Sequence, residues 1–92
     1  MPLSPAIPEF RYDGYLPNGI HLADEAAVLF RFGTSNRRRR MLALRLRQWI
    51  DLARKTRAKR LLIDGSFVTN KVSPGDIDAV VWLGSDFQRF QL

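Results

Sequence analysis

The sequence predicts an α/β protein of the α+β type, in which helices pack on a small mixed or antiparallel sheet. One long stretch with helical periodicity, residues 37–57, precedes two short apolar runs that are typical of buried strands. The length of 92 residues allows one domain, and 46% hydrophobic with 26% charged residues is a globular composition. The absence of cysteine excludes disulfides and thiolate metal sites.

Residues 1–20 are predicted to form an extended arm that precedes a domain over residues 21–92. Four of the five prolines fall in this arm, and the sequence Pro17-Asn18-Gly19 is a turn signal. His21 is the single histidine, so we expect a capping or surface role rather than metal binding. The arm has too many apolar side chains for a free tail and should lie across the domain: Ile7, Phe10, Tyr12, Tyr15, Leu16 and Ile20.

Two helices are expected after the arm. Asp24 can cap a short helix that runs to about Phe32 and ends at Gly33 in left-handed backbone. Residues 34–36 then open the longest helix, about 37–57. Its core stripe comprises Leu42, Leu46, Trp49, Ile50 and Ala53. Its second apolar flank comprises Met41, Leu44 and Leu52, and this flank requires another contact, with the arm, the short helix or a second chain.

The net charge of +6 is unevenly distributed. Residues 31–60 contain twelve basic residues and one acid, a net charge of +11, whereas the rest of the chain carries −5. Arg40, Arg47 and Arg54 align on the polar face of the long helix at intervals of about 10 Å. This row is either a solvated helix face or a track for a nucleic-acid backbone. The consecutive arginines 37–40 point in four directions on a helix and cannot form one patch.

Two strands are expected in the last third of the sequence. Residues 61–63 form a short apolar run that ends at Asp64-Gly65-Ser66, and residues 76–83 form the second strand. Because the second strand is apolar on both faces after Asp78, we expect it to be central in its sheet. No apolar run exceeds five residues and the amino terminus lacks a signal sequence, so we expect no membrane association and a cytoplasmic location.

The residues around these strands are suited to binding a metal-bound nucleotide. Alternation places Asp76 and Asp78 on one strand face about 6–7 Å apart, where Mg²⁺ or Mn²⁺ would relieve their repulsion. Gly65 permits close approach of a phosphate, and Ser66 supplies donors. Lys71 can offer a positive charge. If the strands pair antiparallel, these groups meet at one edge, where a nucleoside triphosphate would fit.

The run 61–66, followed ten residues later by Asp76-Ile77-Asp78 and the apolar residues 79–81, resembles the polymerase-beta-like nucleotidyltransferase superfamily. The resemblance covers about residues 36–83. It implies that Gly65 and Ser66 hold the β- and γ-phosphates and that Asp76 and Asp78 ligate the metals. The implied reaction is metal-dependent transfer of a nucleoside monophosphate to an acceptor hydroxyl of a protein or small molecule, in an enzyme that could be antitoxin-like.

The sequence departs from the family in one respect. Members contribute a third carboxylate from a later strand, but this sequence ends nine residues after Leu83, and neither Asp64 nor Asp86 replaces that group. A two-stranded sheet is also a small layer for a helix. We therefore expect an incomplete, minimal nucleotidyltransferase core. Either a partner chain completes it, or it binds nucleotide without turnover.

Two other functions are left open by the sequence. The chain could be a catalytically inactive module that binds nucleic acid through the basic helix 37–57, with an affinity that falls steeply as salt rises. It could also be an oligomerising interaction protein, since the second apolar flank of that helix requires a second neighbour.

Overall fold

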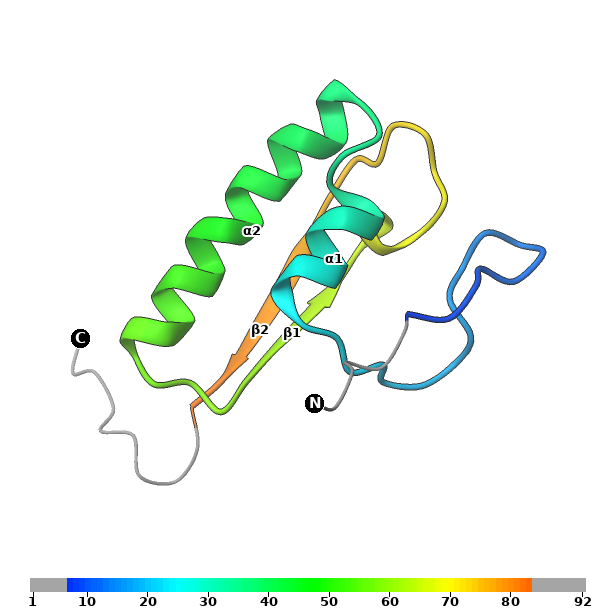
Figure 1. Cartoon of the computed structure of the whole chain (residues 1–92). Coiled ribbons are helices and arrows are strands. Elements are labelled where there is room, and N and C mark those ends of the chain that lie inside the picture. Colours follow the sequence, from blue (N-terminus) through cyan, green and yellow to red (C-terminus); the bar gives the residue numbers. More distant parts are fainter. Residues whose placement is uncertain (1–6, 84–92) are drawn as a thin grey trace.

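The computed structural model describes residues 7–83 of the chain. It contains helices α1 (Glu25–Phe32) and α2 (Arg37–Lys55), strand β1 (Arg60–Asp64), the short 3₁₀ helix η1 (Ser66–Val68) and strand β2 (Asp78–Trp82). The two helices pack on a two-stranded antiparallel sheet (Figure 1), which confirms the predicted α+β class.

Side-chain caps begin both helices as the sequence predicts. The Asp24 carboxylate accepts a hydrogen bond from the Ala27 amide at 2.8 Å, and the Asn36 side chain accepts one from the Arg39 amide at 2.9 Å. Helix α2 ends at Lys55, two residues before the predicted end, because Arg57 has a φ of +55° and cannot continue a right-handed helix.

Gly33 ends α1, but its predicted left-handed conformation is wrong, since its φ is −107°. The glycine is needed for a different reason. A Cβ at this position would lie 2.8 Å from the Cβ of Ala43, which is closer than side-chain carbons pack. Gly33 therefore lets the end of α1 approach α2 closely.

The antiparallel register of the sheet pairs Leu62 with Val80 and Asp64 with Asp78. Strand β2 begins at Asp78, two residues later than predicted. The prediction that it is central is also wrong for the described part of the chain, where its one neighbour is β1. Val80 and Trp82 are 59% and 60% exposed, because no layer within residues 7–83 covers the outer face of the sheet.

The core forms between α2, the ends of α1 and η1, and the inner face of the sheet. Its buried apolar side chains are Phe32, Leu42, Ala43, Leu46, Phe67 and Ile77. The predicted core stripe of α2 is confirmed, since Trp49 and Ile50 also pack against this cluster and Ala53 is buried. The second flank of α2 stays exposed, so the expected contact with the arm or with α1 does not form within the described residues.

The arm lies across the domain as expected, although fewer of its apolar residues are covered. Ile7, Phe10 and Leu16 pack against the core. The Arg31 guanidinium lies 4.5 Å from the centre of the Phe10 ring and donates to the carbonyl oxygen of Pro8 at 3.0 Å. The remaining apolar side chains predicted to be covered are exposed: Tyr12, Tyr15 and Ile20.

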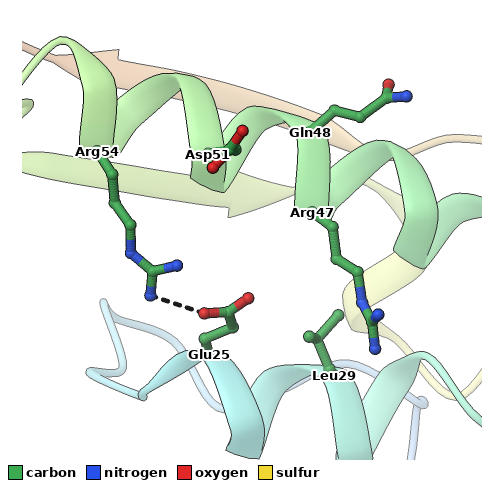
Figure 2. A pocket seen from close by; sticks show the side chains of 6 residues that line it. All are labelled: Glu25, Leu29, Arg47, Gln48, Asp51 and Arg54. Atoms are coloured by element: carbon green, nitrogen blue, oxygen red, sulfur yellow. Dashed lines mark hydrogen bonds and ion pairs between the residues drawn. The ribbon is translucent and has the colours of Figure 1, made fainter.

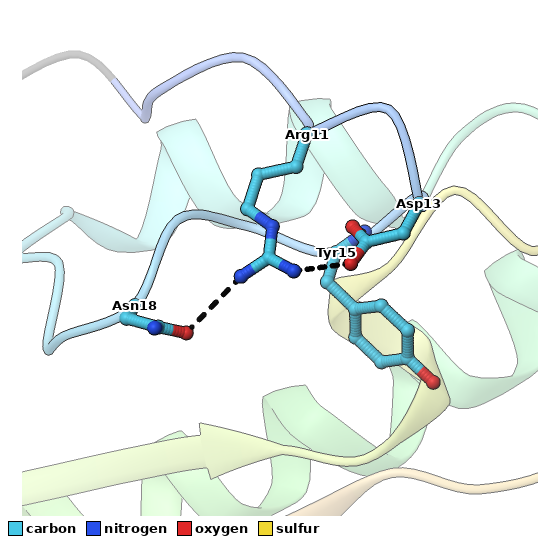
Figure 3. Close-up of polar contacts among 4 residues, drawn as sticks. All are labelled: Arg11, Asp13, Tyr15 and Asn18. Atoms are coloured by element: carbon cyan, nitrogen blue, oxygen red, sulfur yellow. Dashed lines mark hydrogen bonds and ion pairs between the residues drawn. The ribbon is translucent and has the colours of Figure 1, made fainter.

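Polar contacts within the arm close a compact turn. The Arg11 guanidinium bridges the Asp13 carboxylate and the Asn18 side chain (Figure 3). The Nε2 atom of His21 lies 2.7 Å from the carbonyl oxygen of Pro17, four residues earlier in the arm. Across residues 7–83, neither helix combines the length and the apolar character that crossing a membrane requires.

Candidate functional site

The site that the sequence predicts lies at one end of the sheet. Gly65 and Ser66 directly follow β1, and residues 76–78 lead into β2, so antiparallel pairing brings the two segments to the same edge. Gly65 has φ +88° and ψ −177°, a conformation that glycine alone adopts readily. A Cβ there would lie 3.1 Å from Oδ2 and 3.2 Å from the carbonyl oxygen of Asp76. Glycine thus allows the turn to lie directly against Asp76.

Ser66 and Asp76 form a closed set of hydrogen bonds. Oδ1 of Asp76 accepts from the Ser66 amide at 2.9 Å and from the Ser66 hydroxyl at 2.5 Å. The Ser66 Oγ accepts in turn from the Asp76 amide at 3.1 Å, and the Phe67 amide donates to the Asp76 carbonyl oxygen at 3.0 Å. The donors that the resemblance assigns to phosphate are therefore engaged by a carboxylate, and they close the loop between the two strands.

These hydrogen bonds hold the pKa of Asp76 below its ordinary value of 3.8. The Ser66 hydroxyl and amide are the main causes; desolvation opposes them, and the side chains of Asp78 and Lys71 lower the pKa further. The resulting stabilisation is present above the unfolded-state pKa and is lost as pH falls through the lower pKa of the folded state. Asp76 is therefore ionised at neutral pH and able to ligate a cation.

The remaining predicted site residues lie close by. The Asp78 side chain and the Lys71 ammonium are both near enough to Asp76 to lower its pKa. Asp64 stands opposite Asp78 in the strand ladder. No group of three or more acidic or histidine side chains gathers around one point anywhere in residues 7–83, so the available donor set is a pair of carboxylates. Asp86 lies outside the described residues.

Sequence reasoning missed the role of Arg39, which is 5% exposed and is the one buried charged side chain in the described part of the chain. Its guanidinium donates to the carbonyl oxygens of Phe67 at 2.7 Å, Thr69 at 2.6 Å and Lys71 at 2.7 Å, and to that of Phe32 at 3.1 Å. Burial lowers the pKa of Arg39 from its ordinary value. One side chain thereby supplies donors that a loop without strand pairing would otherwise lack.

The neighbours of Arg39 extend this support along the loop. Arg38 donates to the carbonyl oxygens of Pro74 at 2.8 Å and Gly75 at 2.9 Å, and the Nδ2 atom of the Asn36 side chain donates to that of Val72 at 2.7 Å. The start of α2 and the loop run side by side in Figure 1. We call residues 36, 38 and 39 the loop clasp. It fixes the segment that joins the Gly65–Ser66 turn to Asp76.

A signal for the clasp was present in the sequence. Arg39 precedes Leu42 by three residues and Leu46 by seven, so helical spacing places it on the core stripe.

The arm supports the same loop from another side, because the Gly14 carbonyl oxygen accepts from the Asn70 amide at 3.0 Å. Gly14 has a φ of +84°, and a Cβ there would lie 2.2 Å from the Asn70 side-chain oxygen.

The row of arginines predicted to track a phosphate backbone is exposed but not uniform. The Arg54 guanidinium forms a 2.7 Å ion pair with Glu25 of α1, and Arg47 also reaches toward α1 beside Leu29 (Figure 2). These residues line an open groove between the two helices. Arg40 is exposed and forms no ion pair with any residue in the range 7–83.

The chain belongs to a family of unknown function, DUF6932, which matches residues 8–91. Comparison with curated proteins and with solved structures found no match.

Proposed function

We propose that this chain is a nucleotidyltransferase-like protein that binds a Mg²⁺–nucleoside triphosphate at residues 65–78 and transfers the nucleoside monophosphate to an acceptor hydroxyl, with release of pyrophosphate. The observation that carries the proposal is the meeting of the Gly65–Ser66 turn with Asp76 and Asp78 at one end of the sheet. The spacing of these residues, which resembles that of the polymerase-beta-like superfamily, supports the same function.

The donor set fits a magnesium ion. Mg²⁺ is commonly held by one or two protein carboxylates, with waters and substrate phosphates as its other ligands. Asp76 and Asp78 would supply the two carboxylates, and Mn²⁺ would suit the same oxygens. When bound, the cation would neutralise triphosphate charge and polarise the α-phosphate.

Nucleotide binding requires a rearrangement of the Ser66 hydrogen bonds. The Ser66 hydroxyl and amide donate to Asp76, so they can serve a phosphate only after that carboxylate has turned away. The Lys71 ammonium, which already lowers the pKa of Asp76, would add positive charge near the β- and γ-phosphates. Transfer would also need a third carboxylate, and residues 7–83 bring none to the pair formed by Asp76 and Asp78.

Calorimetric titration of the protein with ATP, GTP, CTP and UTP, with Mg²⁺ or with EDTA, tests the binding. We expect Mg²⁺-dependent affinity for at least one nucleotide, weakened at least about tenfold, or 1.4 kcal/mol, by Asp78→Asn. Asp51→Asn is the matched control, since Asp51 is an exposed acid on α2 outside the site. Melting curves check that both variants fold. The proposal fails if the wild-type protein binds no nucleotide in a metal-dependent way.

A labelling experiment tests transfer and identifies the acceptor. The protein is incubated with α-labelled nucleoside triphosphates, Mg²⁺ and a cytoplasmic lysate. We use this lysate because we propose that the protein is cytoplasmic. We expect label on a protein or a small molecule, absent with Asp78→Asn and retained with Asp51→Asn. A labelled protein acceptor would support an antitoxin-like role. Nucleotide binding without label transfer would indicate the binding-only form of the proposal.

A further inference from the structure

Helix α2 presents an apolar face that neither the core nor the nucleotide site uses. Met41, Leu44 and Leu52 are 53%, 60% and 55% exposed, and Gln48 lies between them on the same side of the helix. Positions 41, 44, 48 and 52 follow helical spacing and form a stripe on the side away from Leu42 and Leu46. We call these four residues the outer face of α2. Large exposed apolar side chains that recur along one face of a helix are typical of interaction surfaces.

The surroundings of the outer face are strongly basic. Arg37, Arg40 and Arg45 lie beside the stripe, and none of them forms an ion pair with another residue of the range 7–83. The one acid nearby, Asp51, already pairs with Lys55 at 3.2 Å. These uncompensated cations belong to the segment 31–60, which carries a net charge of +11. The apolar stripe is thus bordered by positive charge.

We propose that the outer face of α2 is the docking site for an acidic amphipathic helix of a partner protein. An apolar stripe with charged borders is the arrangement by which two helices pair, with leucines in the seam and opposite charges beside it. Charge complementarity selects an acidic occupant. A second copy of the chain would bring two 31–60 segments together, each with a net charge of +11, and a phosphate backbone would leave the three apolar side chains uncovered.

This inference does not depend on the proposed nucleotide site. The outer face lies along the middle of α2, whereas the nucleotide site lies at one end of the sheet, next to the loop held by the start of α2. There Ser66 follows β1, Asp76 precedes β2, and Asp78 is the first residue of β2. Docking at the outer face therefore leaves the nucleotide site open. Substitutions on the outer face and in the nucleotide site can be tested separately.

The test uses the full chain and a labelled synthetic peptide of about three heptads, with leucine at positions a and d and glutamate at e and g. The glutamates keep the peptide from pairing with itself. Fluorescence anisotropy should show binding that weakens at least tenfold with Leu44→Gln/Leu52→Gln and with Arg37→Glu/Arg45→Glu. Glutamine preserves helix propensity. Val72→Gln, at an exposed apolar residue of the loop, is the matched control and should leave binding unchanged.

Three comparisons decide the outcome. A scrambled peptide of the same composition, without the leucine stripe, should bind at least tenfold more weakly than the heptad peptide. The proposal is overturned if the heptad peptide does not bind. It is also overturned if the scrambled peptide, or an oligonucleotide of equal charge, binds as tightly as the heptad peptide while Leu44→Gln/Leu52→Gln leaves binding unchanged. It is also overturned if sedimentation reveals a dimer that Leu44→Gln/Leu52→Gln dissociates, because the occupant is then a second copy.

Discussion

Two arginines in the first turn of α2 and the arginines further along the helix use the same functional group in opposite ways. At the start, Arg38 and Arg39 direct their guanidinium groups at backbone carbonyl oxygens of the loop 67–75. Further along, Arg45 and Arg47 are exposed, and Arg54 reaches an acid on the neighbouring helix. The basic character of the segment therefore has two origins. Part of it is internal scaffolding for the site, and part is available for interaction.

The difference follows from what lies next to each turn of the helix. The loop beside the first turn joins two strands without pairing to either, so its buried carbonyl oxygens need donors from elsewhere. A guanidinium offers five N–H donors in a fixed plane and can satisfy several carbonyl oxygens at once. No such loop passes the middle of α2 in the described residues, and the arginines there keep their donors free for solvent or a partner.

The largest effect is expected from Arg39→Met, which would leave four carbonyl oxygens without their donor. The loss should lower the free energy of unfolding by at least about 3 kcal/mol, measured by urea denaturation followed by circular dichroism. Arg40→Met, at the adjacent exposed residue, should change it by less than about 0.5 kcal/mol. Equal losses for the two variants would mean that the two kinds of arginine do not differ.

A smaller effect is expected from Gly65→Ala, which tests the turn where the loop leaves β1. Alanine does not readily adopt φ +88° and ψ −177°, and its Cβ would press on Asp76. We expect a loss of about 1–3 kcal/mol in the free energy of unfolding. Gly75→Ala is the matched control within the same loop, since a Cβ there meets nothing within 4 Å. A neutral Gly65→Ala would show that the turn does not require glycine.

The smallest effect is expected from Arg54→Ala, which changes an exposed arginine in the last turn of α2. The Arg54 side chain, which forms the ion pair with Glu25, is 66% exposed. Its removal should therefore lower the free energy of unfolding by less than about 1 kcal/mol. The loss should shrink in high salt, where surface charges are screened. Arg45→Ala, which removes no ion pair within residues 7–83, should show no such salt dependence in urea denaturation. A loss comparable to that of Arg39→Met would contradict the distinction.

Local signals in the sequence were sufficient for the elements and for the position of the candidate site. Asp24 and Asn36 are capping residues, and they begin α1 and α2. The run before Gly65 and the run after Asp78 became strands, and antiparallel pairing then had to bring the turn and the two carboxylates to one edge. These outcomes depend on spacing along a few residues, which a sequence displays directly.

Other features depended on which segments became neighbours. The sequence did not indicate that the Ser66 hydroxyl would donate to Asp76, because hydrogen bonds across ten residues require the loop to close. The sequence pattern placed Val80 and Trp82 in a central strand. Both side chains are exposed, because the outer face of the sheet is buried only where another layer covers it.

The sequence by itself thus determined the helices and the strands, since these follow from short-range periodicity and capping. The antiparallel pairing of the strands then brought Gly65 and Ser66 to the two aspartates. Helical spacing places Arg39 on the core stripe, but only the tertiary structure decided that loop carbonyl oxygens lie beside it. Arg39 and Arg40 are chemically identical neighbours, and one is buried while the other is exposed. The physical reason is that a helix turns by about 100° per residue, and the packed loop lies on one side of it.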